Sequence, residues 1–438
     1  MKKILLFFSA LAIFASCSKD GPETATANLD LQLSYANESY NTALKDKEVT
    51  IRFKNLLNGS ISEVKQKNGL IQIPNLSPGS YDLEASITFT QDEFKLLTNE
   101  DINMTSITFN ASAKKVEIIN NKELQLELVA GVMGDFIIKQ IYYAGSDRTN
   151  GAIFRDQFFE IYNNTDQVLY ADSLYFGRLW GKQTPSDTKH HFQPNGQFDW
   201  SKSADMTMGN AANTDYVYLR DLFMIPGTGK TYPIQPGESI VIAQNALNHK
   251  VPFTGNNGKE VSVKDPSLTV DLSKANFEVY YGDLPGETPF ASDINNPNVP
   301  NVEVINYQGN DWLLDNLGRD SYYIFKGKTR AEVLALKSYA APTTALPGPD
   351  ATKYRQLPIS WILDGVEVQP NVESSQIPKK LNAFIDAGFQ VVPNGAYSSQ
   401  SIIRKTESQV GGRKILQDSN NSSNDFISIK AEPRAFAN

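Results

Sequence analysis

The chain has 438 residues, a formal net charge of −8 at pH 7 and a hydrophobic content of 40%. This length exceeds what one hydrophobic core usually supports, so two or three domains are expected, and the hydrophobic content excludes a wholly disordered chain. The acidic balance argues against nucleic-acid binding, which needs a clustered positive field. With 19 Tyr and 23 Phe but only 3 His, the composition favours aromatic-rich strands over imidazole catalysis.

The first 17 residues have the organisation of a secretory signal. Lys2 and Lys3 precede an apolar run from Ile4 to Phe14, and small residues follow before Cys17. Because the segment ends on cysteine, it resembles a bacterial lipoprotein signal, which implies that Cys17 is acylated, for example with palmitate. Ordinary secretion with an unmodified Cys17 is the alternative. Since Cys17 is the only cysteine, neither a disulfide nor a thiolate metal site is expected elsewhere.

Residues 18–28 show no apolar periodicity and predict a flexible tether. Lys19, Asp20 and Glu23 partly resemble the address of Bacteroidota lipoproteins that reach the outer face of the outer membrane. After Phe14 no apolar run approaches the roughly 20 residues of a membrane helix. We therefore expect a chain that is lipid-anchored in the outer membrane and displayed at the cell surface.

Period-two alternation between residues 29 and 130 predicts a β-rich first domain. Pro74 is predicted to end one strand, and Pro78 and Gly79 to form a turn before the next. The segment IPNLSPGSYDLEAS resembles transthyretin-like or carboxypeptidase-regulatory-like domains, which implies a small seven-stranded β-sandwich. The strands expected from the alternation cover residues 29–35, 49–53, 70–73, 81–89 and 124–128.

A second domain is expected over residues 131–438, beginning with strands at 135–143, 157–162 and 167–176. FIIKQIYY, DQFFEIYNNTDQVLYADSLYF and YPIQPGESIVIAQNA together resemble the lamin-tail immunoglobulin-like domain. Residues 398–434 look like its closing strands, with Arg404 on a strand, residues 418–421 in a turn and Phe426 in the core. The positions that match this family, all with structural roles there, are Glu160, Asn163, Asn164, Pro236, Gly237 and Glu238.

The stretch at about 246–397 would then be a large elaboration of one immunoglobulin-like frame, since loop-closure cost grows slowly with length. Helices are expected at 329–339, capped by Thr329, and at 378–387, with Leu381, Phe384 and Ile385 on one face. The predicted fold class is thus all-β, with two β-sandwich domains and short helices within the insertion of the second. This order resembles an uncharacterised Bacteroidota outer-membrane lipoprotein family, and the resemblance implies work beside TonB-dependent receptors.

Motifs that would carry catalysis are absent from the sequence. It contains no G-x-S-x-G elbow, and GTGKT at 227–231 lacks the phosphate-loop spacing and predicts a hairpin turn. His190 and His191 are adjacent, so on an extended segment they point in opposite directions, and His249 lies far along the chain. Two loop histidines are therefore expected rather than a metal site. We assign no catalytic residue, metal or cofactor.

An acidic turn at 315–321 leaves two interpretations open. Asp315, Asn316 and Asp320 lie close together, but they supply too few oxygens at the wrong spacing for an EF-hand. The segment is interpreted as an Asx-rich turn, with a structural calcium ion as the alternative.

Aromatic residues are concentrated between Leu174 and Trp200. Flat rings among polar and glycine neighbours are typical of a recognition surface, because they bury large area at low entropic cost. The alternative is that they pack under long loops. The candidate residues for binding a ligand or partner are Trp180, His190, His191, Phe192 and Trp200.

These observations predict a surface-anchored, non-enzymatic lipoprotein that binds a ligand or docks a receptor in TonB-dependent nutrient or iron uptake. One alternative is an adhesion or scaffold protein that uses the same sandwiches for protein or glycan contacts. Another is an envelope hydrolase, which would need two carboxylates facing each other across a substrate cleft.

Overall fold

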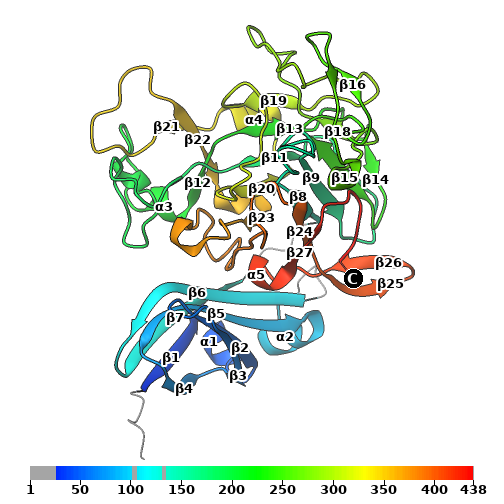
Figure 1. Cartoon of the computed structure of the whole chain (residues 1–438). Helices are drawn as coiled ribbons and strands as arrows, with labels where there is room; N and C mark the ends of the chain where they lie inside the picture. The colour runs from blue at the N-terminus through cyan, green and yellow to red at the C-terminus, as the bar shows by residue number, and fades with distance from the viewer. Residues whose placement is uncertain (1–25, 101–105, 131–134, 438) are drawn as a thin grey trace, which may run out of the picture.

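The computed structural model describes residues 26–100, 106–130 and 135–437. The chain is mainly β, with several sheets and a few short helices (Figure 1). Cys17 and the signal segment lie outside the described residues. Within the described ranges, no helix is both long and apolar enough to cross a membrane.

Residues 27–100 and 106–130 contribute seven strands to one hydrogen-bonded sheet, shown in blue to cyan at the bottom of Figure 1. The strand order is β3-β2-β5-β6-β7-β1-β4, and the pairing of β1 with β7 is parallel. Alternate residues of β1 such as Leu29 and Leu31 are fully buried, as the period-two pattern predicts. The elements are β1 (Ala27–Tyr35), α1 (Tyr40–Ala43), β2 (Glu48–Asn55), β3 (Ile61–Lys67), β4 (Leu70–Leu76), β5 (Gly79–Thr90), α2 (Gln91–Thr98), β6 (Ser106–Ile118) and β7 (Lys122–Ala130).

The strands predicted in this region are confirmed, but the predicted end at Pro74 is wrong. Strand β4 continues through Pro74 to Leu76. Because β4 is an edge strand, the missing N–H of proline need not remove a ladder hydrogen bond.

Two further sheets face each other across the main core of residues 135–437. Phe159 of one sheet lies 5.9 Å from Phe176 and 5.8 Å from Tyr322 of the other, measured between ring centroids. The first sheet has the order β18-β15-β9-β8-β24-β27 and contains β8 (Phe136–Tyr142), β9 (Phe158–Asn163), β15 (Ser239–Ala243), β18 (Phe277–Glu278), β24 (Gln400–Arg404) and β27 (Phe426–Lys430). The second has the order β19-β13-β11-β20-β23 and contains β11 (Tyr175–Arg178), β13 (Leu222–Met224), β19 (Glu303–Asn306), β20 (Ser321–Phe325) and β23 (Ile362–Glu367).

Smaller elements surround these two sheets. A three-stranded sheet has the order β12-β22-β21, and three two-stranded pairs lie at the periphery. The strands are β10 (Leu169–Tyr170), β12 (Tyr216–Leu219), β14 (Pro233–Ile234), β16 (Phe253–Thr254), β17 (Glu260–Val261), β21 (Ser338–Ala340), β22 (Lys353–Pro358), β25 (Thr406–Val410) and β26 (Arg413–Leu416). The short helices are α3 (Ala211–Thr214), α4 (Arg330–Leu334) and α5 (Ser422–Asp425), with 3-10 turns at 200–202, 266–268, 359–361 and 373–375.

The Asn-rich turn after β9 and the Pro-Gly-Glu segment before β15 are joined by two backbone hydrogen bonds. The Gly237 N–H donates to the Asn163 carbonyl, and the Asn163 N–H donates to the Glu238 carbonyl, both over 3.0 Å. Gly237 has φ +79°, a backbone conformation that favours glycine. Glu160 forms a fully buried ion pair with Lys139 at 2.8 Å.

Arg404 lies at the end of β24, where it organises a buried charge cluster. Its guanidinium approaches Asp364 at 2.6 Å, Asp418 at 2.9 Å and Asp425 at 3.4 Å. The arginine is only 2% exposed, and it also donates to the Ile138 carbonyl. The cluster thus ties β23, β24, β8 and the turn before β27 together.

Strands from the predicted elaboration belong to the sheets themselves. β20 and β23 extend the sheet that β11 and β13 begin, and β22 pairs with β12. The predicted strand at 167–176 is divided into β10 and the start of β11, because Ser173 between them has φ +55°.

The helix predicted at 329–339 is present but short, ending at Leu334, with Thr329 and Glu332 in a capping box. The helix predicted at 378–387 is wrong, since this segment contains turns, bends and irregular backbone and no helix. The backbone N–H groups of Lys380 and Leu381 both donate to the buried Glu367 carboxylate over 3.1 Å. Leu381 and Ile385 are buried as predicted, although not on a helix.

The N-terminal sheet meets the rest of the chain near α5, which lies above β6 in Figure 1. Asn110 of β6 donates from Nδ2 to the Ser419 carbonyl over 2.5 Å. Arg52 of β2 donates to the Ser423 carbonyl and to Asn424 Oδ1, each over 3.3 Å. This contact is therefore polar at these positions.

Candidate functional site

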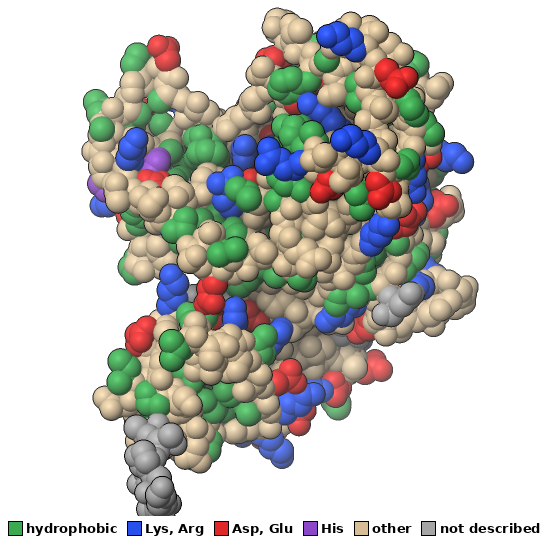
Figure 2. All heavy atoms as spheres, in the orientation of Figure 1, with side chains coloured by type: hydrophobic (Ala, Val, Ile, Leu, Met, Phe, Trp, Pro, Cys, Tyr) green, Lys and Arg blue, Asp and Glu red, His purple; other side chains and the backbone are tan. Residues whose placement is uncertain are grey.

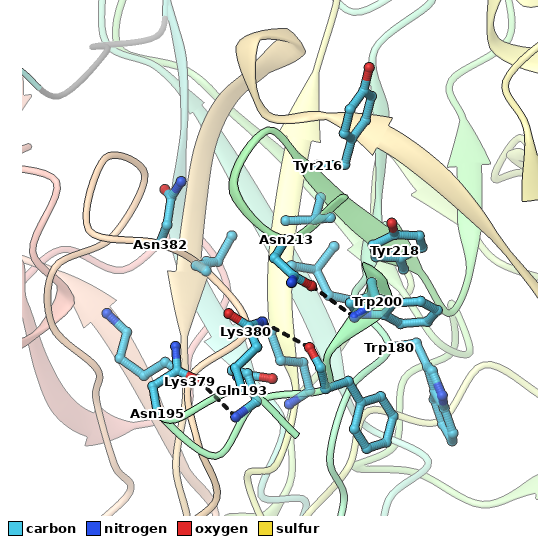
Figure 3. A pocket seen from close by; sticks show the side chains of 15 residues that line it. Trp180, Gln193, Asn195, Trp200, Asn213, Tyr216, Tyr218, Lys379, Lys380 and Asn382 are labelled. Atoms are coloured by element: carbon cyan, nitrogen blue, oxygen red, sulfur yellow. Dashed lines mark hydrogen bonds between the residues drawn. The ribbon is translucent and has the colours of Figure 1, made fainter. Parts of the chain in front are cut away.

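A cleft of about 90 Å³ lies where the loop at 193–200 and β12 meet turns from much later in the sequence (Figure 3). The loop at 193–200 forms one wall, β12 forms another, and the turns at 379–382 close it. Two of the predicted binding residues, Trp180 and Trp200, line it. The other lining residues are Leu179, Gln193, Asn195, Gln197, Phe198, Asn213, Tyr216, Val217, Tyr218, Lys379, Lys380, Leu381 and Asn382.

The aromatic walls of the cleft are held rigid by stacking. The Trp200 ring lies 3.5 Å from the Tyr218 ring at an angle of 9°, and the Trp180 ring lies 4.8 Å from Tyr354 at 5°. Burial raises the pKa of Tyr218, whose hydroxyl donates to the Ala212 carbonyl and accepts from Gln356 Nε2. Trp200 is 6% exposed, so its stack mainly supports the wall, whereas Trp180 is only half-buried.

Side-chain amides supply the polar surface of the cleft. Gln193 and Gln197 use their N–H groups internally, on the carbonyls of Phe198 and Pro378. Within the described residues, by contrast, the Nδ2 groups of Asn195 and Asn382 donate to no other group, while each Oδ1 accepts from a backbone N–H. Two amide donors thus remain for a ligand.

The two lysines at the cleft are directed to the protein rather than to a ligand. Lys380 donates from Nζ to the Arg319 carbonyl over 2.7 Å, and Lys379 donates to the Asp386 carbonyl. Burial lowers the pKa of Lys380, although Glu367 and Asp320 oppose this effect. The cleft therefore offers neutral hydrogen-bonding groups more than charge.

The structure separates the other predicted binding residues from the cleft. His190 is held by a 2.8 Å contact between Nδ1 and Asp187 Oδ2, and its ring stacks on Phe198 at 4.3 Å. Phe192 packs 5.9 Å from Phe198, and His191 is exposed. The histidine side chains visible in Figure 2 lie on the upper-left lobe, where Figure 1 places α3, β21 and β22. His190 and Phe192 thus pack against Phe198, a residue that lines the cleft, without lining the cleft themselves.

The remaining histidine and the acidic turn are also engaged within the fold. Burial lowers the pKa of His249 to about 4, and its Nε2 lies 3.0 Å from the Asn245 carbonyl. Arg319 holds Asp315 through two contacts of 2.8 Å, while Arg178 holds Asp320 at 3.0 Å. Burial alone would raise the pKa of Asp320, but Arg178 and Arg220 outweigh it and hold the pKa at about 2. Across the described ranges, no group of three or more His, Cys, Asp or Glu side chains is placed to hold a metal ion.

Sequence reasoning missed the part of the cleft that comes from the second half of the chain. Tyr354 and Asn382 lie more than 150 residues beyond Trp200. No local motif marks them, because their role depends on β22 pairing with β12 and on the turns that follow β23.

Residues 235–433 match a family described as "Protein of unknown function (DUF4876)". The crystal structure of a DUF4876 family protein from Bacteroides thetaiotaomicron VPI-5482 is similar in fold, with a TM-score of 0.53 and 23% sequence identity. The similarity covers 93% of this chain and 96% of that one. A putative adhesin from Bacteroides ovatus ATCC 8483 has a TM-score of 0.19 and 9% identity over 50% of this chain and 83% of its own. A comparison with curated proteins gives no match.

Proposed function

We propose that this chain is a lipid-anchored, non-enzymatic binding protein of the cell surface whose cleft takes one sugar unit of a neutral glycan. The cleft itself carries the proposal. It combines the half-buried Trp180 ring with the unused amide donors of Asn195 and Asn382. A ring face and neutral hydrogen-bond donors match the apolar face and the hydroxyls of a sugar.

The size of the cleft supports recognition of part of a larger molecule. Pockets that enclose a small ligand usually measure about 300–1,000 Å³, and this cleft is about 90 Å³. It therefore suits one protruding unit of a polymer better than a whole enclosed nutrient. Asp199, in the loop at 193–200, accepts hydrogen bonds from Ser201 and Asn213, which supports binding rather than hydrolysis.

We infer that the two parts of the chain are a transthyretin-like sandwich over 29–130 and a lamin-tail-like domain over 131–438. The sheets that face each other through Phe159 and Phe176 support the second assignment. Acylated Cys17 would hold the protein in the outer membrane. There it would present glycan to a TonB-dependent receptor, as the resemblance of the signal and of the domain order suggests.

Binding of soluble polysaccharides tests the proposed function. Purified protein is titrated with starch, xylan, mannan and arabinogalactan, and the variant Trp180→Ala is compared with Trp361→Ala. Trp361 is a half-buried tryptophan that packs on Phe325 and does not line the cleft. We expect Trp180→Ala to weaken binding about tenfold or more, the effect of losing roughly 1.4 kcal/mol at a hot spot, and Trp361→Ala to leave it unchanged.

Equal binding by both variants, or no binding of any glycan by the unmodified protein, would contradict this function. Deleting the gene separates uptake from adhesion. Impaired growth on one glycan supports an uptake role, whereas lost attachment with normal growth would favour the adhesion alternative.

A further inference from the structure

A cluster of buried polar side chains lies at the other side of the large body, beside β15 and β18 at the upper right of Figure 1. Gln244 and Asn245 directly follow β15. Asp293 lies between β18 and β19, and Asp311 lies between β19 and β20. Gln244 and Asn245 are 0% exposed, Asp293 is 1% exposed and Asp311 is 6% exposed. None of the four lines the cleft.

Each of these side chains carries a buried oxygen with no hydrogen-bond donor in the described part of the chain. The four atoms are Gln244 Oε1, Asn245 Oδ1, Asp293 Oδ2 and Asp311 Oδ1. A buried acceptor without a partner costs about 1–3 kcal/mol, more when it is charged, so nearly all such groups in proteins are paired. Four of them in neighbouring segments indicate a shared missing partner.

Hydrogen bonds made by the same side chains place these residues near one another. Gln244 Nε2 donates to Asp311 Oδ2 over 2.8 Å, so the other end of the same amide lies beside that carboxylate. Asn245 Nδ2 donates to the carbonyl of Ser292 over 2.7 Å, which places the Asn245 amide beside the residue that precedes Asp293. Asp311 lies close enough to Asp293 for its charge to raise the pKa of the Asp293 carboxyl.

The cluster contains more acidic than basic side chains. Arg155 is the cation that contacts it, through one 2.7 Å bond to Asp311 Oδ2. With both carboxylates ionised, one negative charge is left over. The nearby Glu278 provides no hydrogen-bond donor for the four oxygens. Both of its own oxygens are acceptors, one for the N–H of Ala246 and the other for the N–H of Asn296.

We propose that Asp293, Asp311, Gln244 and Asn245 bind one calcium ion through these four oxygens. Carboxylate and amide oxygens are the ligands that Ca²⁺ prefers, and its six to eight positions would be completed by water or backbone carbonyls. The absence of thiolate and imidazole ligands disfavours zinc. The ion would fasten the segment around Asp293 to the end of β15. This inference is independent of the glycan cleft.

Thermal unfolding with and without calcium tests the proposal. The full chain is stripped with EDTA and then titrated with CaCl₂, with MgCl₂ and NaCl as comparisons. At one hundred times the Kd, a bound ion is expected to raise the Tm by roughly 5–10 °C. Tb³⁺ luminescence excited through Trp312, the buried neighbour of Asp311, provides a direct binding signal.

Two substitutions locate the ion. Asp293→Asn should lower the Ca²⁺ affinity at least tenfold, while Asp283→Asn, the same change at an exposed position of the same segment, should bind like the unmodified protein. A proton shared by the two aspartates is the competing occupant. In that case Ca²⁺ would not change the Tm of the unmodified protein, Tb³⁺ would give no signal, and the proposal would be overturned. The titration of the unmodified protein decides this even if a variant fails to fold.

Discussion

The Arg404 cluster allows one stability prediction to be worked through. In the variant Arg404→Met, a methionine stem replaces the guanidinium that now contacts three aspartates with N···O distances of 2.6, 2.9 and 3.4 Å. Asp364, Asp418 and Asp425 are nearly as buried as the arginine itself. The substitution therefore leaves buried carboxylates without their shared cation.

Removing one partner of a buried ion pair costs about 3–5 kcal/mol, because the remaining charge stays desolvated. A change of 1 kcal/mol moves the Tm by about 2–4 °C in a domain of 150–250 residues and by less in a larger one. We therefore expect Arg404→Met to lower the Tm by roughly 6–15 °C. The control is Arg330→Met, the same change in an exposed ion pair with Glu303, which should cost within about 1 kcal/mol.

The loss should also depend on pH. Burial raises the pKa of Asp364 and of Asp425 to about 7, although Arg404 opposes this. Because these folded-state values lie above the unfolded ones, the stabilisation that protonation provides is complete at low pH and is lost as pH rises through about 7. Without Arg404 the charged carboxylates cost more, so the difference in Tm should be larger at pH 8 than at pH 5. Equal melting of variant and unmodified protein at pH 8, or a larger difference at pH 5, would refute this reasoning.

Two further predictions concern a glycine with positive φ, Gly237, and a carboxylate that accepts backbone N–H groups, Asp172. Gly237→Ala should lower the free energy of unfolding by roughly 1–3 kcal/mol, because Gly237 has a φ of +79° and a Cβ there would lie 2.8 Å from Arg413 Cγ. The control is Gly348→Ala, since no heavy atom lies within 4 Å of a Cβ at that position. Its free energy of unfolding, measured by thermal denaturation, should stay within about 0.5 kcal/mol of the unmodified protein. Burial raises the pKa of Asp172, but N–H groups of Tyr232, Thr231 and Gly229 outweigh it and hold the pKa at about 2. The stabilisation by Asp172 is therefore present above pH ~4 and lost as pH falls towards 2, so the Tm of Asp172→Asn should fall less over that range than that of the unmodified protein. An equal fall in both proteins would count against this role of Asp172.

Period-two alternation predicted most of the first sheet because one face of each strand is buried, and the two strands it missed break that pattern. In β6 the buried hydrophobic residues Phe109 and Ala111 occupy odd positions, although the polar Thr108 and Asn110 are buried as well, whereas Val116 and Ile118 occupy even ones. The register against β5 shifts between Tyr81 and Leu83, and Lys115 has φ +53°. This bulge reverses which face each residue takes. In β3, an edge strand, the side chains are exposed or half-buried, so little alternation is expected.

The incorrect prediction of a helix at 378–387 shows that tertiary contacts can override a local sequence pattern. The spacing of Leu381, Phe384 and Ile385 describes a buried face, and this burial is present. The backbone conformation follows instead from the hydrogen bonds that two buried carboxylates accept. Glu367 takes the N–H groups of Lys380 and Leu381, and Asp386 accepts those of Glu367 and Ser422 over 2.8 Å. A charge buried in this way needs such donors, and the chain turns to provide them.

Dependence on tertiary structure also explains why the sequence indicated only part of the cleft and none of the four residues of the proposed calcium site. Trp180 and Trp200 lie in one aromatic-rich segment, so composition could mark them, whereas Asn382 joins them only through the turns after β23. The oxygens of Gln244, Asp293 and Asp311 come from three loops, and each residue type is ordinary at its own position. What distinguishes them is that they are buried together without donors. That property arises only when strands β15, β18 and β19 bring the loops side by side, so a site of this kind becomes visible in the fold and not in the sequence.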